Sequence, residues 1–188
     1  MLRPIDIIDK HNRPTGEKSD PNDANLRGLW HRGAHVILFT PSGRILIQKR
    51  SHTAFRHPDK IDIGAGGFVD SGETPQRTAI REVFEETGIL LSADDLIFLG
   101  TSKYNHRWRA GSIFKTSRSI VYTFAARLPK EDYKLAPQED EVAWVGFIPL
   151  KSAWWLIRRH YIKSLGWLLP TYAYYRKALK QTAKFIRD

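Results

Sequence analysis

A glycine-rich loop that leads directly into an acidic helix is the feature that most constrains this chain. The segment 67–89 reads GFVDSGETPQRTAIREVFEETGI. Thr74 can cap the start of a helix, Pro75 suits its first position, and Gly88 can end it in a left-handed backbone conformation. The spacing predicts a helix between these signals, with a buried face formed by three apolar residues, Ala79, Val83 and Phe84.

Three carboxylates share one face of this predicted helix. At about 100° per residue, Glu82 and Glu86 lie one above the other, with Glu85 beside them. Like charges at this distance repel one another unless a cation neutralises them, and Arg81 supplies only one positive charge. Because Mg²⁺ prefers carboxylate oxygens, this face is a candidate site for a hard divalent cation.

The glycines before the helix suit the other half of such a site. Gly64, Gly66 and Gly67 let the backbone approach a ligand closely, and a free carbonyl there can join a metal shell. A metal between this loop and the helix can bind diphosphate oxygens and stabilise the charge that builds during phosphoryl displacement. One of the glutamates, or an acid from a loop, would take the proton of the attacking water.

The segment 67–89 resembles the signature of the Nudix hydrolase family. That signature is a glycine, five residues, a glutamate, seven residues, and then Arg-Glu-aliphatic-any-Glu-Glu-any-Gly-aliphatic. Every defined position is met in this chain, by Gly67, Glu73, Arg81, Glu82, Val83, Glu85, Glu86, Gly88 and Ile89. A layout of strands and helices that is compatible with the family runs from about residue 33 to residue 150.

This resemblance implies hydrolysis of a nucleoside diphosphate that is linked to another moiety, with Mg²⁺ or Mn²⁺ as the cofactor. It implies that Glu73 pairs with Arg81 and holds the loop. It also implies a metal site formed by three side chains and one backbone carbonyl: Glu82, Glu85, Glu86 and Gly67. We therefore predict catalytic-site roles for Glu73, Arg81, Glu82 and Glu85.

Two alternative functions are weighed against hydrolysis. The order of segments also resembles the isopentenyl-diphosphate isomerase branch of the superfamily, whose members need a cysteine and a metal-binding histidine in the loop. This chain has Gly66 and Phe68 at those places and contains no cysteine, which disfavours isomerisation. The second alternative is a binding module of the same fold without turnover. A damaged signature would favour that module, whereas this signature is complete.

Substrate recognition is expected outside the signature. The segment 104–118 is predicted to be a loop in which aromatic residues stand beside cations, a composition that suits a phosphate and a stacked base but also an ordinary exposed hairpin. Either Glu139 or Glu141, in the acidic turn before a late strand, could complete the metal site or serve as the base, although such turns often face solvent. The candidate substrate-binding residues are Arg50, Tyr104, Arg107, Arg109 and Glu141.

Hydrophobic periodicity predicts an α+β fold, a Nudix-type α/β/α sandwich with a mixed sheet. An exposed polar loop is expected at 17–25, and a hairpin at 33–40 and 44–50 joined by Pro41-Ser42-Gly43. Two helices separated by Pro170 are expected to close the chain. Further strands are predicted at 5–9, 61–69, 96–101, 119–127 and 142–148.

The net charge of +10 is concentrated at the C-terminal end. Residues 150–188 hold nine basic residues against one acid, Asp188. We expect 1–150 to form the Nudix domain with an N-terminal strand and hairpin extension, and 151–188 to form basic, aromatic-rich helices packed on that domain. Packing in a homodimer, or contact with an anionic membrane or nucleic acid, is the alternative for these helices.

No cysteine, no apolar segment of bilayer-spanning length and no secretory signal are found in the sequence. We therefore expect a cytoplasmic protein. The family resemblance implies that its partner is a small nucleotide-like diphosphate.

Overall fold

The fold is built on one mixed sheet. The structure, a computed structural model, describes residues 3–54, 57–163 and 172–186. Its strands are β1 (Ile5–Ile8), β2 (Pro14–Ser19), β3 (Trp30–Phe39), β4 (Arg44–Arg50), β5 (Ile61–Ile63), β6 (Ala65–Phe68), β7 (Leu96–Ala110), β8 (Ile113–Arg127) and β9 (Val142–Pro149). Its helices are α1 (Pro21–Arg27), α2 (Pro75–Thr87), the 3-10 helix η1 (Ala93–Asp95), α3 (Leu150–Lys163) and α4 (Tyr172–Ile186).

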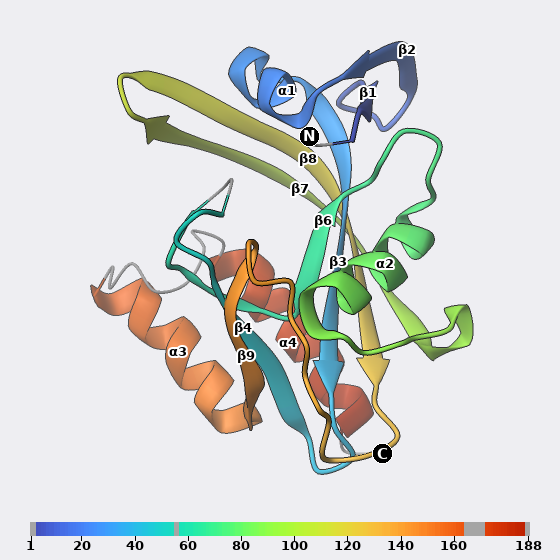
Figure 1. Cartoon of the computed structure of the whole chain (residues 1–188), viewed down its shortest axis with the longest axis vertical. Coiled ribbons are helices and arrows are strands. Elements are labelled where there is room, and N and C mark those ends of the chain that lie inside the picture. The colour runs from blue at the N-terminus through green and yellow to red at the C-terminus, as the bar shows by residue number, and fades with distance from the viewer. Residues whose placement is uncertain (1–2, 55–56, 164–171, 187–188) are drawn as a thin grey trace.

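Strand β3 is the axis of the sheet. It pairs in parallel with β8 along its whole length, and on its other side it pairs antiparallel with β1, β6 and β4 in turn. Strand β4 separates from β3 after the pair Phe39–Ile45 and continues as the partner of β5 and β9. Beyond this point β6 rather than β4 is the partner of β3, so the two halves of the sheet diverge (Figure 1).

Both faces of the sheet are covered by helices. Val36 and Leu38 belong to a core cluster with α2, whereas Ile37 and Phe39 belong to a second cluster with α3 and α4. A central strand that is buried on both faces is expected to be continuously apolar, as the run VILF is. Figure 1 shows α2 on one side of the sheet and α4 on the other. This arrangement confirms the predicted α/β/α sandwich with a C-terminal helical pair.

Helix α2 has the predicted ends but a different buried face. Thr74 caps it by accepting a hydrogen bond from the backbone N–H of Arg77, and Gly88 ends it with φ of 75°. The prediction that Phe84 is buried was wrong, because half of its side chain is exposed. The buried arc is centred on Ala79 and Val83 together with two glutamates, and Phe84 lies about 100° beyond Val83.

The N-terminal segment 17–25 is not the exposed loop that its polar composition predicted. Strand β2 continues to Ser19, and helix α1 follows it. Asp20 caps α1 through the backbone N–H of Asn22, Pro21 occupies the first turn, and Gly28 ends the helix with φ of 65°. These are the usual signals for helix ends, and here they outweigh the polar composition of the segment.

The prediction that 104–118 forms a loop was also wrong. Strands β7 and β8 continue through it as one long hairpin, paired from Leu96–Ala126 to Ala110–Ile113. Figure 1 shows this hairpin extending away from the body of the fold. Along its outer part the partly buried side chains of Tyr104, His106 and Trp108 alternate with exposed polar ones, so the period of a strand was present in the sequence. The many cations of the segment were instead interpreted as those of a loop.

The C-terminal helices pack on the second face of the sheet. Ile157 of α3 and Tyr175 and Leu179 of α4 are almost fully buried in that cluster. At the far end of α4, the side chain of Ile186 lies over the 41–43 turn, where a Cβ added at Gly43 would come within 2.5 Å of it. Pro170, the predicted separator of the helices, lies outside the described residues. The domain boundary after residue 150 and any role of 151–188 at a membrane, on nucleic acid or in a dimer stay predictions.

Every helix in the described part of the chain is too short or too polar to cross a lipid bilayer.

The packing of α4 can be tested by a truncation in its buried face. Leu179 is fully buried, so Leu179→Ala is expected to lower the free energy of unfolding by about 2–5 kcal/mol. The neighbouring exposed variant Lys180→Ala is the matched control, expected to change it by less than about 0.5 kcal/mol. Urea denaturation measures both. Equal stability of the two variants would show that α4 does not contribute to the core.

Candidate active site

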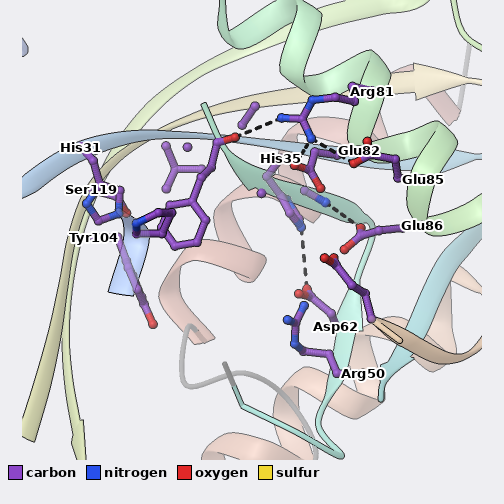
Figure 2. A pocket seen from close by; sticks show the side chains of 18 of the residues that line it. His31, His35, Arg50, Asp62, Arg81, Glu82, Glu85, Glu86, Tyr104 and Ser119 are labelled. Atoms are coloured by element: carbon purple, nitrogen blue, oxygen red, sulfur yellow. Dashed lines mark hydrogen bonds and ion pairs between the residues drawn. The ribbon is translucent and has the colours of Figure 1, made fainter. Parts of the chain in front are cut away.

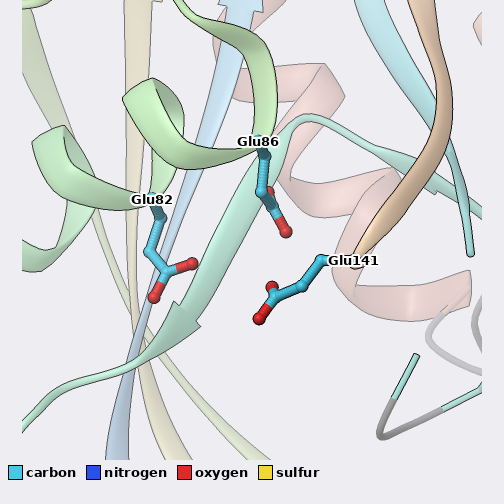
Figure 3. Close-up of side chains that lie close together, drawn as sticks. All are labelled: Glu82, Glu86 and Glu141. Carbon is cyan, nitrogen blue, oxygen red and sulfur yellow. The ribbon is translucent and has the colours of Figure 1, made fainter. Parts of the chain in front are cut away.

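Three carboxylates converge where α2 faces the beginning of β9. Oxygens of Glu82, Glu86 and Glu141 all lie within 4.8 Å of one another. Figure 3 shows Glu82 and Glu86 directed from successive turns of α2 toward Glu141, which immediately precedes β9. We call this group the three-carboxylate cluster. Such a set of oxygen donors suits a hard divalent cation.

Different parts of the fold deliver these carboxylates. Glu82 and Glu86 share a face because they are four residues apart on α2. Glu141 arrives through the pairing of β4 with β9, which ends at Arg50–Val142 after a register shift. A hydrogen bond from the backbone N–H of Ser51 to the carbonyl of Glu141, 2.9 Å long, fixes the backbone there. The cluster thus depends on a contact between residues about ninety positions apart in the chain.

The glycine loop gives Glu82 its place. A Cβ added at Gly67 would lie 2.3 Å from the Oε1 of Glu82, so a side chain at this position would displace the carboxylate. The neighbouring backbone N–H of Gly66 donates a hydrogen bond of 2.9 Å to Glu86. Gln48 donates a second one to the same oxygen, also 2.9 Å long. Loop and helix therefore form one interlocked unit.

Arg81 balances the acids on the loop side of the cluster. Its guanidinium lies 2.8 Å from Glu82, 2.9 Å from Glu85, 3.0 Å from Glu73 and 3.5 Å from Asp70. Burial alone would lower the pKa of Arg81, but the surrounding carboxylates raise it, so the side chain stays charged. One cation thus serves four acids, and Glu86 and Glu141 are not among them.

The cluster holds more negative charge than its surroundings compensate. Burial raises the pKa of Glu82 to about 7, with Glu85 and Glu141 adding to the rise and Arg81 opposing it. Burial and the nearby Glu82 raise the pKa of Glu86 well above its ordinary value, although Arg50 opposes the rise. Burial also raises the pKa of Glu141. A divalent cation would supply the missing positive charge, so the residues present fit a metal.

The cluster opens into a cavity of about 380 Å³, which we call the central cavity. Glu85 also lines it, with one third of its side chain exposed, but lies outside the three-carboxylate cluster. Of the predicted substrate-binding residues, Glu141, Arg50 and Tyr104 line the cavity, and Figure 2 labels the last two. Glu139 is exposed and is not part of its wall, in contrast to Glu141.

The two predicted arginines of the β7–β8 hairpin do not line the central cavity. The guanidinium of Arg107 lies over the ring of Phe114, 4.3 Å from its centroid. Arg109 donates a hydrogen bond of 3.0 Å to the carbonyl of Gly111 at the hairpin turn. Both side chains are therefore engaged near the hairpin tip, and their role in substrate binding stays a prediction.

The structure adds cavity residues that were not assigned to the site from the sequence. His35 comes from β3, Asp62 from β5, and Tyr174 and Tyr175 from α4. One signal for Asp62 was available, since an acid between two isoleucines in a short apolar strand is unusual. The two tyrosines offered no such signal, because tyrosines at helical spacing usually belong to a core.

Comparisons with known proteins agree with this geometry. The NUDIX domain family model matches residues 29–170. An uncharacterized Nudix hydrolase of Streptomyces coelicolor is 34% identical over 146 residues, which cover 77% of this chain and 74% of that protein. The crystal structure of DR0079 from Deinococcus radiodurans superposes with a TM-score of 0.63, covering 98% of each chain at 18% identity.

A second similar structure is the NUDIX domain of Shewanella oneidensis NrtR, solved in complex with ADP ribose. It has a TM-score of 0.58 and 17% identity, and the match covers 82% of this chain and 86% of that one. At these identities both structural matches establish the fold alone.

The charge imbalance in the cluster predicts a pH-dependent response to metal. Because the pKa of Glu82 is raised from 4.5 to about 7, protonation of this side chain stabilises the folded protein. That contribution to the free energy of unfolding is fully present below pH 4.5 and is lost as the pH rises through about 7. Mg²⁺ at about a hundred times its Kd should stabilise the protein by about 2.7 kcal/mol, or about 5–10 °C in Tm, at pH 8.

At pH 5.5 the same Mg²⁺ concentration should raise Tm much less, because protons compete for the carboxylates. Thermal unfolding with and without Mg²⁺ at the two pH values measures the effect. Asp132→Asn, which alters an exposed acid outside the central cavity, is the control and should keep the wild-type response. A rise in Tm that is equal at both pH values would contradict the assignment.

Proposed function

The chain belongs to the Nudix family of hydrolases, and on that premise we propose that it hydrolyses the diphosphate linkage of a nucleoside diphosphate attached to a second group. We further propose that Mg²⁺, or Mn²⁺ in its place, is held by Glu82, Glu86 and Glu141. The observation that carries this proposal is the three-carboxylate cluster, whose oxygens lie within 4.8 Å of one another at the wall of the central cavity. When bound, such an ion withdraws charge from the phosphate oxygens and favours attack at phosphorus.

The cluster differs from the metal set that the family resemblance implies. Glu141 stands with Glu82 and Glu86, while Glu85 is paired with Arg81 at 2.9 Å. The Gly67 carbonyl remains a candidate ligand, because the backbone at Gly67 lies against Glu82. We therefore assign Glu85 a different role from that of a ligand.

We propose that Glu85 accepts the proton of the attacking water. Its carboxylate lines the central cavity, remains accessible to solvent and lies outside the three-carboxylate cluster. A water oxygen forms the new bond to phosphorus, its proton passes to Glu85, and the bond from phosphorus to the bridging oxygen breaks. Arg81 orients Glu85 during this step, and Glu73 holds Arg81 through contacts of 3.0 and 3.2 Å.

The central cavity also bears on the two alternative functions. Phe68 packs on His31, with ring centroids 5.2 Å apart, at the place where an isomerase would present a metal-binding histidine. Hydrolysis is therefore preferred to isomerisation. A binding module without turnover would not need Glu85 beside a metal cluster, and only an activity measurement separates it from an enzyme.

The hydrolytic assignment is tested with purified protein, Mg²⁺ and a panel of nucleoside triphosphates, nucleotide sugars, ADP-ribose and dinucleoside polyphosphates. Loss of a residue that only hydrogen-bonds to a metal ligand commonly reduces activity 10- to 100-fold. Loss of a proposed ligand itself, in Glu86→Gln or Glu141→Gln, should therefore lower kcat/KM by more than about 100-fold. Glu139→Gln, two residues from Glu141 but outside the central cavity, is the matched control and should stay within about twofold of wild type.

Wild-type activity in Glu86→Gln and Glu141→Gln would refute the proposed metal ligands. Absence of turnover on every substrate would favour the binding module instead. Replacement of Glu85 by glutamine should lower kcat while leaving the Mg²⁺ requirement unchanged, which distinguishes a proton acceptor from a ligand.

A further inference from the structure

The end of the central cavity that lies away from Arg81 has its own polar floor. It is formed by His35 of β3, Asp62 of β5, and Tyr174 and Tyr175 of α4. In Figure 2 the ring of His35 points toward Asp62, and Arg50 lies beside that carboxylate. We call these four residues the inner floor. They belong to no part of the three-carboxylate cluster, and the metal chemistry does not use them.

His35 is the member of the inner floor whose side chain lacks hydrogen bonds to the described part of the chain. Its side chain is only 11% exposed, and neither ring nitrogen has a hydrogen-bond partner among the residues that the structure describes. The nearest carboxylate oxygen, the Oδ1 of Asp62, lies 3.7 Å from its Nε2, beyond hydrogen-bond length. A buried imidazole whose ring nitrogens make no hydrogen bond destabilises a fold, and such exceptions need a reason. Because His35 lines the central cavity, a ligand in the cavity can supply the missing partners.

Asp62 makes the inner floor negative. Its Oδ1 accepts hydrogen bonds from the hydroxyl of Tyr175 and from the backbone N–H of Ile63. Burial alone would raise the pKa of Asp62, yet that pKa lies below its ordinary value because His35, Tyr175 and Arg50 favour the anion. An anionic floor next to Glu86 repels a second phosphate. It attracts groups that donate hydrogen bonds, such as hydroxyls.

Aromatic rings give the inner floor a fixed shape. The ring of His35 meets Tyr174 edge-on, with centroids 5.4 Å apart, and the two tyrosine rings are 5.7 Å apart at 64°. The hydroxyl of Tyr174 is held by Thr123 of β8 at 3.0 Å. Apolar walls with a few precisely placed polar groups are typical of small-ligand sites. The C-terminal helix α4 is thereby part of the cavity wall as well as part of the core.

We propose that the inner floor is a subsite for a hydroxyl-bearing sugar of the substrate, with the sugar hydroxyls bridging His35 and Asp62. This inference rests on the proposed function, because the three-carboxylate cluster sets where the diphosphate lies. An imidazole offers one donor and one acceptor in either neutral form, which matches a hydroxyl. The sugar has two possible sources, the ribose of the nucleoside or a sugar on the distal phosphate.

The experiment compares ADP-ribose with two analogues. In the methyl ester of ADP a methyl group replaces the distal ribose, and in 2′-deoxyadenosine diphosphate ribose the nucleoside ribose loses one hydroxyl. The wild type should prefer ADP-ribose to one of these analogues by about tenfold or more in kcat/KM, because a site built to hydrogen-bond a hydroxyl rejects an analogue that lacks it. The analogue that is rejected identifies the source of the sugar.

The variant His35→Leu should bring that preference close to one while retaining the activity on the rejected analogue. Asp62→Asn is the second variant and should have the same effect. The test can therefore still be made if one of the two variants does not fold. Tyr122→Phe is the matched control, since it removes a tyrosine hydroxyl that is bonded to Asn12 outside the central cavity. An unchanged preference in both variants, or no preference in the wild type, overturns the subsite.

Failure of the proposed function gives a different result. If the wild type releases no product from ADP-ribose, calorimetric titration with ADP-ribose and Mg²⁺ replaces the kinetic measurement. Affinity that is at least tenfold weaker in His35→Leu then supports the subsite although hydrolysis is refuted. Equal affinity of the two proteins, including no binding by either, overturns the subsite as well.

Discussion

The burial of Glu82 and Glu86 on one face of α2 is the constraint on which the rest of the structure depends. Buried like charges are unfavourable unless hydrogen bonds and cations compensate them. Gln48 and the Gly66 backbone N–H serve Glu86, and Arg81 serves Glu82. These contacts leave the cluster short of positive charge, which is the physical reason for assigning a divalent cation to it.

The sheet brings the remaining parts of the site to these two glutamates. Separation of β4 from β3 opens the central cavity, and pairing of β4 with β9 delivers Glu141 opposite α2. Helix α4 closes the other end with Tyr174 and Tyr175, on the face of the sheet opposite to α2. Helix α4 of the basic C-terminal tail is therefore part of the cavity wall, while its cations Arg176, Lys177 and Lys180 are exposed.

Local patterns allowed much of this to be predicted, and tertiary contacts account for what was missed. The loop and α2 follow from spacing within 23 residues, so their caps and the Glu82–Glu86 pair were predictable. Glu141 was one of two open alternatives, because strand pairing rather than spacing selects it over Glu139. The β7–β8 hairpin was missed because the cations of its outer part were interpreted as those of a loop, although aromatic and polar side chains alternate along 104–109. Phe84 was misplaced because buried glutamates occupy the arc that an apolar residue usually fills.

The central claim is that Glu82, Glu86 and Glu141 together hold the catalytic cation. Crystals soaked in Mn²⁺ at pH 8, measured at the manganese absorption edge, locate that ion directly by its anomalous signal. The account predicts a peak within about 2.5 Å of at least one oxygen of each of these glutamates, with Glu85 directed away from it. A peak bound by Glu85 instead of Glu141, or no peak at the cluster, would contradict the account.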